Sequence, residues 1–340
     1  MKKIDFHTHI LPPDWPNLRE RYGYGGWVQL EDSAEPNKRN MTVDGKFFRA
    51  VKDNCYAVEP RFEDMDATGV DMQVICTVPI MFAYWAEPQH THDLAVLLND
   101  HCAEVVAAHP TKFLALGTVP LNDTARAIKE LERCKSELGF RGVQIGSHVN
   151  GTNLDDASLF PFFEACQALD MALVVHPWDM LARERMTKYW HSWLVGMPAE
   201  VTLAISSMIF GGVFERLPKL RVCFGHGGGA FPFTVGRIQH GFDTRPDLCA
   251  VDNPKGPREY IGHFWVDSIT HDADAFRYIL KLFGADKVIL GSDYPFPLGE
   301  HHPGKMIEEM GDEISEETRR KINYRNTFEF LGMKEEAKAQ

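Results

Sequence analysis

Short apolar runs of strand length alternate with longer segments of helical period over most of the chain. Runs of roughly four to eight apolar residues between turn residues favour buried strands, and apolar residues recurring at helical spacing favour helices. The pattern predicts eight strands, at residues 3–9, 72–78, 113–121, 143–148, 172–176, 222–226, 264–268 and 288–293. It predicts helices between several of them, at residues 94–109, 124–138, 159–169, 199–217 and 273–283.

This alternation predicts an α/β fold in which the strands form a parallel sheet with right-handed crossovers. Eight such strands allow the sheet to close on itself, so we expect a (β/α)8 TIM barrel. Barrels of this kind commonly reach this length as one unit. We therefore expect a single domain over residues 1–340, with one or two extra C-terminal helices after Gly299, notably at residues 316–331.

One segment does not fit a plain barrel. Residues 11–60 separate the first strand from its helix, which is too long for an ordinary connection between a strand and a helix. The segment is rich in glycine, proline and aromatic residues, and GYGGWVQL and DGKFFRAV within it resemble short strands. We expect a small inserted β-rich unit that lies over the barrel mouth.

Two histidines on the first predicted strand are candidates for metal binding. His7 and His9 lie two residues apart, so their side chains point to the same face of the strand. The alternate residues, such as Phe6 and Ile10, occupy the other face and would pack against helices. A His-x-His pair alone is a weak indication of a metal site.

Titratable residues also end other predicted strands. ALVV leads into His176, VCF leads into Gly225 and His226, and VILGS leads into Asp293. In a (β/α)8 barrel the C-terminal strand ends meet at one mouth, where active sites of this fold lie. A hydrogen-bonded polar group at the rim explains any one of these residues, but it explains all of them together poorly. Imidazoles and a carboxylate suit Zn²⁺ or a similar divalent ion.

Composition narrows the class of protein. The net charge is −12, and acidic residues are spread along the chain, which argues against a nucleic-acid-binding surface. The seven cysteines show no paired spacing and read as small core residues in a reducing compartment. The N-terminus lacks a signal-peptide core, and we expect no apolar stretch that approaches the roughly 20 residues of a membrane-spanning helix. We expect a cytosolic protein with no membrane or nucleic-acid partner.

Several longer motifs point to a known family. They are RYGYGGWVQL, CTVPIMFAYWA, GVQIGSHVN, VVHPWDM, YWHSWLVGMPAE, CFGHGGGAFPFTVGRI and ILGSDYPFPLGE. Together these motifs resemble the amidohydrolase superfamily and, within it, the metal-dependent decarboxylase branch. The resemblance covers nearly the whole chain.

The resemblance implies one Zn²⁺ per subunit and assigns its ligands to His7, His9, His176 and Asp293. It implies that His226, the histidine of HGGG, is the catalytic base, and that Asp293 serves as both a ligand and a proton carrier. The activity implied is non-oxidative decarboxylation of 2-amino-3-carboxymuconate 6-semialdehyde to 2-aminomuconate 6-semialdehyde and CO₂, a step of tryptophan degradation by the kynurenine pathway.

The resemblance also implies how the substrate, a small dicarboxylate semialdehyde, is bound. It places substrate-binding residues at Arg49, Arg237, Trp193, Met180 and Phe296. It further implies a homodimer in which Arg237 enters the neighbouring subunit's site. Without the resemblance, a solvated surface charge would be the favoured interpretation of Arg49, and Arg237 could be an ordinary charge on a helix face. One departure is peripheral: Val43 occupies a position where relatives can carry lysine.

Three alternatives stay open at this point. A sibling decarboxylase acting on an aromatic acid such as a dihydroxybenzoate would share the metal ligands and the HGG histidine. A metal-dependent hydrolase could use the same kind of site, since a metal can activate water for attack on an ester or amide. A non-catalytic binding protein could keep the fold, because fold alone does not fix function.

Overall fold

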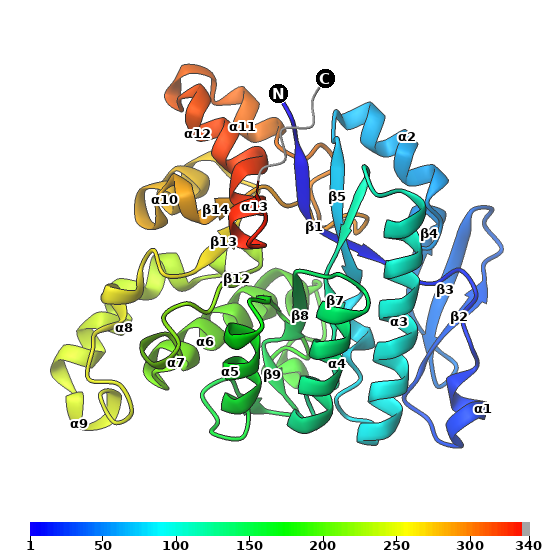
Figure 1. Cartoon of the computed structure of the whole chain (residues 1–340), viewed down its shortest axis with the longest axis horizontal. Helices are drawn as coiled ribbons and strands as arrows, with labels where there is room; N and C mark the ends of the chain where they lie inside the picture. The colour runs from blue at the N-terminus through cyan, green and yellow to red at the C-terminus, as the bar shows by residue number, and fades with distance from the viewer. Residues whose placement is uncertain (335–340) are drawn as a thin grey trace.

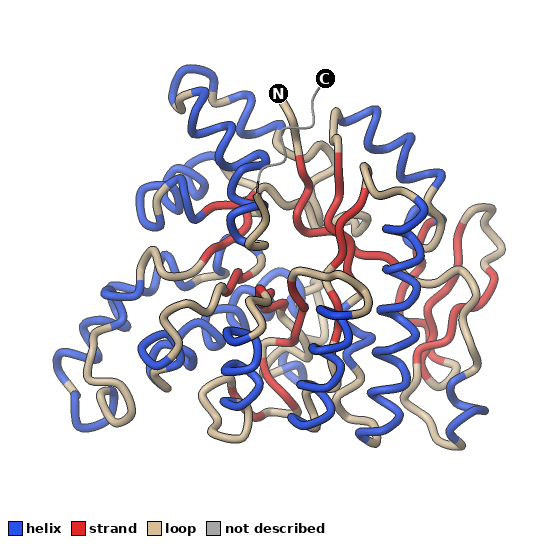
Figure 2. Tube along the Cα trace, viewed as in Figure 1, coloured by secondary structure: helices blue, strands red, loops and turns tan. Residues whose placement is uncertain are grey.

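The structure, a computed structural model, describes residues 1–334, so the last six residues of the expected single domain lie outside the described part. Its centre consists of parallel strands in a three-stranded sheet, in the order β1-β5-β6, and a six-stranded sheet, in the order β14-β13-β12-β11-β8-β7. Their bounds are β1 Ile4–Ile10, β5 Met72–Thr77, β6 Phe113–Ala115, β7 Gly117–Thr118, β8 Gly142–Gly146, β11 Ala172–His176, β12 Val222–Phe224, β13 Trp265–Asp267 and β14 Val288–Ile289. Figure 2 shows these strands in the middle of the molecule with helices around them.

Main-chain hydrogen bonds connect the two sheets at both edges. On one side, Leu116 is the single residue between β6 and β7, and its N–H donates to the carbonyl of Ile75 on β5 (2.9 Å). On the other side the chain after β14 runs along β1, where His9 N donates to Tyr294 O (2.7 Å) and Asp293 N donates to His7 O (2.9 Å). The arrangement is a TIM-barrel-like α/β fold.

All eight predicted strands have a counterpart, and the largest differences lie at their C-terminal ends. The run 113–121 divides into β6 and β7, and the run 143–148 continues past β8 into a short hairpin of β9 (His148–Val149) and β10 (Thr152–Asn153). In the run 288–293 only the first two residues pair with β13, because the chain then turns toward β1 and Asp293 adopts a positive φ of 62°.

The helices cover the outside of these strands, as Figure 1 shows for α3, α4 and α5. The Asp123 side chain accepts a hydrogen bond from Arg126 N, which caps the start of α4. The predicted helix 199–217 divides at Gly211 and Gly212, and the pattern missed α2 and the helix α8 that follows His226. Bounds are α2 Glu59–Thr68, α3 Pro88–Ala108, α4 Thr124–Ser136, α5 Phe160–Ala168, α6 Met197–Phe210, α7 Val213–Arg216, α8 Phe231–Thr244, α9 Pro246–Cys249 and α10 Ala273–Phe283.

Residues 11–60 contain a small antiparallel sheet, seen at the edge of the molecule beside α3 in Figure 1. It consists of β2 (Val28–Asp32), β3 (Lys38–Val43) and β4 (Lys46–Lys52), preceded by the short helix α1 (Leu18–Tyr22). Sequence reasoning placed strands only near β2 and β4. It missed β3 because KRNMTV is mostly polar and only half-buried. A separate apolar core, which includes Trp27, Met41 and Val51, holds the unit together.

The C-terminal segment forms α11 (Lys305–Glu309), α12 (Glu316–Arg320) and α13 (Asn326–Phe330). A π-helical turn at Lys321–Arg325 joins α12 to α13, so the predicted helix 316–331 is present but irregular. Phe330 packs edge-on against Phe6 of β1 (5.2 Å between ring centroids) and against Trp265 of β13 (5.4 Å). The segment therefore covers one end of the central strands.

One expectation about long apolar segments is wrong. The continuous helical stretch Ser192–Phe210 has 19 residues and a mean hydropathy of 1.5, so by length and composition alone it could span a membrane. Half of that stretch is buried inside the protein, and buried core helices pass the same test. All seven cysteines, which lie within the described residues, are free, in agreement with the sequence expectation.

Candidate metal centre and active site

Four side chains that are far apart in the sequence meet at the C-terminal ends of the central strands. His7 and His9 lie on β1, His176 ends β11, and Asp293 follows β14. All four are buried, and one ligand-type atom from each lies within 4.8 Å of the others. The Oδ1 atom of Asp293 is 3.0 Å from His9 Nε2, 3.7 Å from His7 Nε2 and 4.0 Å from His176 Nε2. The sequence prediction that these four residues converge is confirmed.

The opposite ring nitrogens show how the three imidazoles are oriented. Nδ1 of His7 donates to a carboxylate oxygen of Asp267 (2.8 Å), and Nδ1 of His9 and of His176 donate to main-chain carbonyls (2.9 and 2.8 Å). Carbonyl and ionised carboxylate oxygens only accept, so each Nδ1 carries the proton and each Nε2 presents a lone pair. Nε2 of His7 and of His176 is buried without a hydrogen-bond partner among the described residues. This donor set fits a divalent metal ion.

Burial and neighbouring charge favour the ligand forms of these groups. Burial lowers the pKa of His176 to about 3, so its imidazole is neutral. Burial alone would raise the pKa of Asp293, but interactions with the surrounding imidazoles outweigh it and hold that pKa well below its usual value. An ionised carboxylate among imidazoles is a typical environment for Zn²⁺ and related ions.

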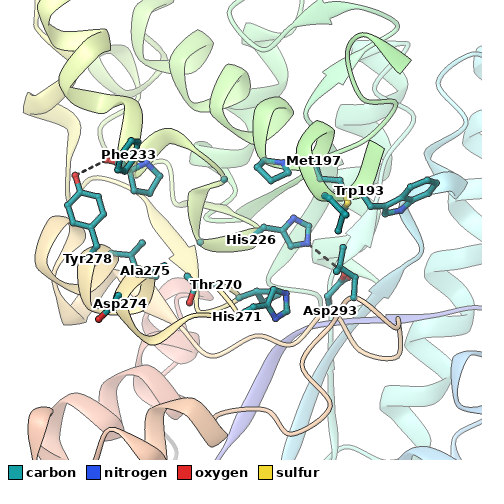
Figure 3. Close-up of a pocket in the computed structure, with 18 residues that line it drawn as sticks. Trp193, Met197, His226, Phe233, Thr270, His271, Asp274, Ala275, Tyr278 and Asp293 are labelled. Carbon is teal, nitrogen blue, oxygen red and sulfur yellow. Dashed lines mark hydrogen bonds and ion pairs between the residues drawn. The ribbon is translucent and has the colours of Figure 1, made fainter. Parts of the chain in front are cut away.

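His226 lies beside this group and belongs to the tight turn after β12. Its Nε2 is 3.7 Å from the other oxygen of Asp293, Oδ2, and its ring lies 5.4 Å from the ring of His7. Its side chain is 14% exposed, against 3% for His7 and for His176, so it borders the open side of the cluster. Figure 3 shows the His226 ring pointing toward Asp293. The geometry suits a residue that moves protons next to a metal.

Both His226 and Asp293 have positive φ angles, 56° and 62°. Residues other than glycine seldom adopt this conformation, and it costs free energy that the surrounding structure must supply. At His226 the glycines of HGGG take up the rest of the sharp turn: Gly227, Gly228 and Gly229 all have positive φ. The strand ends therefore direct these two side chains into the site through strained main chain.

Sequence reasoning missed one buried carboxylate, Asp267 at the end of β13. Besides the proton of His7 Nδ1, it accepts the main-chain N–H of His226 (2.9 Å) and of Gly227 (2.8 Å). A signal was present, because Asp267 is a titratable residue at the C-terminal end of a predicted strand, like His176 and Asp293. It was overlooked because Ser268 follows it and the run does not end on the aspartate.

A cavity of about 670 Å³ opens beside His226 and Asp293. Much of its wall is apolar, with contributions from α6, α8 and α10 (Figure 3). Trp193, expected at the substrate site, lines it, and His271 was not expected there. The volume suits a small organic ligand.

Arg49 reaches toward the same region from β4 of the inserted sheet. Its guanidinium lies over the rings of Phe296 (4.7 Å), Phe48 (5.2 Å) and Trp193 (5.6 Å). Burial lowers the pKa of Arg49, because its charge is partly removed from water. Within residues 1–334 no carboxylate lies within ion-pair distance of it. A desolvated guanidinium held by aromatic rings is ready to bind an anion.

The other three residues expected to bind substrate lie in different environments. Phe296 is nearly buried, and its ring lies 5.4 Å from that of His9, so it adjoins the metal ligands. Met180 is half-buried and packs beside Gly196, outside the cavity lining. Arg237 is exposed on α8, does not line the cavity, and makes no hydrogen bond or ion pair within the described chain. The structure does not bring Arg237 into the site of its own chain.

Comparisons with known proteins agree with this geometry. A family profile described as amidohydrolase matches residues 4–333. The chain is 57% identical to a 2-amino-3-carboxymuconate-6-semialdehyde decarboxylase of Dictyostelium discoideum over 331 residues, which cover 97% of the chain and 92% of the relative. It is 37% identical to the protein of the same name from Caenorhabditis elegans, over 98% of the chain and 95% of the relative.

A solved structure gives the same fold. The dihydroxybenzoic acid decarboxylase of a Polaromonas species, crystallised with manganese and the inhibitor 2-nitroresorcinol, superposes with a TM-score of 0.75. It is 23% identical, and the match covers 97% of each chain. At this identity the likeness supports the fold alone.

Proposed function

This chain belongs to the amidohydrolase family, and we propose that it is the carboxy-lyase that converts 2-amino-3-carboxymuconate 6-semialdehyde to 2-aminomuconate 6-semialdehyde and CO₂. The observation that carries this assignment is the agreement, over almost the full chain, with two relatives that bear this activity in their names. The reaction is a step of the kynurenine pathway. Of the three alternatives, the hydrolase and the non-catalytic binding protein lose their support, because the named relatives are decarboxylases.

The test compares substrates. Purified protein is mixed with freshly generated 2-amino-3-carboxymuconate 6-semialdehyde or with 2,6-dihydroxybenzoate, and CO₂ release is followed for both. We expect release from the first substrate and little from the second. Release from the dihydroxybenzoate alone would move the assignment to a decarboxylase of aromatic acids.

Zn²⁺ is the metal that we propose for the site, one ion per chain, bound by His7, His9, His176 and Asp293. The three imidazole lone pairs and the ionised carboxylate support this choice, although the Polaromonas relative was crystallised with manganese. When bound, the ion supplies Lewis acidity that polarises oxygen ligands and acidifies water. Elemental analysis of the purified protein, followed by reconstitution with Zn²⁺, Mn²⁺ or Co²⁺, tests the choice. Highest turnover with another metal would contradict it.

The side chains around the metal match the needs of decarboxylation. Breaking the C–C bond to the departing carboxylate releases CO₂ and leaves an electron pair on carbon, which must take up a proton. His226 Nε2 faces the metal cluster and the cavity, so it can remove a proton from water and deliver that proton to the carbon, while the hydroxide left behind regains a proton from solvent. Arg49 binds a substrate carboxylate and fixes its orientation, while Trp193 and Phe296 shield that ion pair from water.

A homodimer completes the substrate site in this proposal. Arg237 is free of partners in the described chain, and exposed apolar side chains, Phe233 at 88%, Leu194 at 49% and Tyr278 at 40%, lie along the same cavity. Large exposed apolar side chains in one area favour an interface. A second copy of the chain would cover them and bring its Arg237 to the carboxylate that Arg49 does not bind.

Mixing two inactive variants tests this sharing. Arg237→Ala should retain Zn²⁺ and lose activity, and His226→Ala should do the same. If Arg237 acts in the partner's site, a mixed dimer has one doubly damaged and one intact site, so random mixing restores about a quarter of wild-type activity. A mixture that stays inactive after verified subunit exchange would contradict a shared site.

Three structural and cellular proposals complete this picture. We propose that the two parallel sheets form one closed (β/α)8 barrel, which the main-chain bonds between β1 and residues 290–294 support. We propose that residues 11–60 form an inserted unit over the barrel mouth, which is supported by the reach of Arg49 to Phe296.

We also propose that the protein is cytosolic, which is supported by seven free cysteines that fit a reducing compartment. Fractionation of the source cells tests the location.

A further inference from the structure

The carboxylate of Asp267 is almost fully buried, at 1% exposure, and accepts four hydrogen bonds within the site. Oδ2 accepts from His7 Nδ1 (2.8 Å) and from the main-chain N–H of His226 (2.9 Å). Oδ1 accepts from the N–H groups of Gly227 (2.8 Å) and Ile269 (3.1 Å). One carboxylate oxygen therefore contacts both a metal ligand and the catalytic histidine.

Two glycines next to this carboxylate leave room for its contact with His7. A Cβ atom added at Gly291 would lie 2.8 Å from His7 Cβ and 3.2 Å from Asp267 Cβ. A Cβ atom added at Gly225 would lie 3.2 Å from His7 Cε1 and 3.6 Å from Asp267 Oδ2. Both glycines border the pair formed by His7 and Asp267, and at Gly291 a larger residue would force the pair apart. The contact is thus built into three neighbouring strand ends.

The two bonds of Oδ2 have different consequences. The bond to His7 fixes the ring so that its Nε2 faces Asp293, and it raises the electron density of the ligand nitrogen. The bonds to His226 N and Gly227 N hold the turn in which His226 adopts its positive φ of 56°. Without an acceptor these buried N–H groups would be unsatisfied, and the strained turn could relax.

We propose that Asp267 is a positioning residue that couples metal affinity to the orientation of His226. The metal part rests on the donor geometry alone, and the part about turnover rests on the proposed function. Asp267 acts through His7 and His226 and need not touch the substrate.

The test uses Asp267→Asn, which keeps the size of the side chain but replaces one accepting oxygen with a donor. Glu130→Gln is the matched control, because Glu130 is a carboxylate of equal burial (1%) whose partners, Asn99 and Arg133, lie outside the site. Three quantities are measured: the Zn²⁺ dissociation constant in competition with a chromophoric chelator, the visible spectrum of the Co²⁺-loaded protein, and kcat at saturating Zn²⁺.

For Asp267→Asn we expect the Zn²⁺ dissociation constant to rise by about 10–100-fold and the Co²⁺ spectrum to change. We expect kcat to remain at least about tenfold below wild type when Zn²⁺ is saturating, because the general base is misaligned. The control should lower thermal stability and leave all three quantities near wild type. Wild-type Zn²⁺ affinity and Co²⁺ spectrum in Asp267→Asn would overturn the proposal, and so would full recovery of kcat by excess Zn²⁺.

If Asp267→Asn does not fold, Asp267→Glu serves instead, because it keeps the charge and moves it by one methylene group. We expect its turnover at saturating Zn²⁺ to fall, and wild-type affinity with wild-type turnover would overturn the proposal. Failure of the proposed function is a separate result: wild-type protein loaded with Zn²⁺ would release no CO₂, whereas the affinity and Co²⁺ measurements need no substrate.

Discussion

The proposed metal end and the proposed substrate end of the site are built in different ways. At the metal end, His7, His9 and His176 stand on strands, are almost fully buried, and have their second ring nitrogen fixed by a hydrogen bond. At the substrate end, Arg49 comes from the inserted sheet and Trp193 from the π-helical turn before α6, while Arg237 stands exposed on α8.

The difference separates the part of the site that one chain forms by itself from the part that, in our proposal, a second chain completes. Rigid strand ends that are hydrogen-bonded to each other can hold ligands to the accuracy that a metal needs. Loops, helices and an inserted sheet adapt more easily, and they are where related decarboxylases with other substrates would differ. We therefore expect substitutions of the metal ligands to remove metal and activity together, and substitutions at the substrate end to lower activity while the metal stays bound.

Loss of a metal ligand should have the largest effect. His176→Ala removes one of three imidazoles, so we expect Zn²⁺ content to fall and kcat to drop by about 10³-fold or more, since the metal supplies several kcal/mol of stabilisation. Metal analysis and CO₂ release measure both. His101→Ala, on α3 outside the site, is the control and should keep its metal. A His176→Ala protein with full Zn²⁺ content would show that this residue is not a ligand.

His226→Asn should have the next largest effect and should separate catalysis from metal binding. We expect Zn²⁺ content to stay normal and kcat to fall by about 10²–10⁴-fold, the usual contribution of a general base. Loss of the metal from this variant would instead make His226 a ligand, and the distinction between the base and the four ligands would have to be redrawn.

Substitution of Arg49, at the substrate end, should have a smaller effect on activity. Arg49→Met keeps the aliphatic stem among the aromatic rings and removes the charge, so we expect kcat/KM to fall by about 10–100-fold through loss of charge-assisted hydrogen bonds, with normal Zn²⁺ content. Arg49→Lys should recover part of the loss. Arg183→Met, an exposed arginine paired with Asp179, is the control and should be neutral. A normal kcat/KM in Arg49→Met would remove Arg49 from substrate binding.

Glu300→Gln should change turnover least and instead alter how stability depends on pH. Burial, together with the charges of Asp5 and Asp267, raises the pKa of Glu300 to about 8. A raised pKa means that the folded protein holds a proton that the unfolded chain releases. The stabilising contribution is therefore present below the ordinary pKa of 4.5 and is lost as the pH rises through about 8.

Glu300→Gln mimics the protonated form, so its advantage over wild type should grow from pH 5 to about pH 8.5, reaching about 1–3 kcal/mol in the free energy of unfolding. Thermal unfolding of the chelator-treated proteins measures it. Glu313→Gln, which removes an exposed carboxylate paired with Arg277, should show no such growing advantage. A gain that does not vary with pH would contradict the raised pKa.

The sequence was most informative where a residue's position on a strand determined the direction of its side chain. The strand at 172–176 ended on His176 as predicted, and the four ligands converged because parallel strand ends meet at one edge. The family resemblance singled out Arg49 as a substrate-binding residue, a role that stays a prediction, whereas periodicity alone would have left it as a surface charge. Its actual reach to Phe296 depends on how the inserted sheet docks, and local sequence does not encode such docking.

Other features depended on interactions that no single segment reveals. The helix α8 was missed because it begins directly after the glycine-rich turn that follows His226. Asp267 was missed because its strand run continues into Ser268 and because three of its four partners lie at least 40 residues away in sequence. The sharing of Arg237 between subunits stays a prediction, because a single chain shows only that this side chain is exposed and unpaired within residues 1–334.

The most direct test of the central claim, that one metal ion held by His7, His9, His176 and Asp293 drives the decarboxylation, is a titration. Chelator-treated protein is loaded stepwise with Zn²⁺, and CO₂ release from 2-amino-3-carboxymuconate 6-semialdehyde is measured at each step. We predict that the rate starts near zero and rises linearly until it levels off at one Zn²⁺ per chain. A rate that is already full without metal, or that rises only with a second ion, would contradict the account.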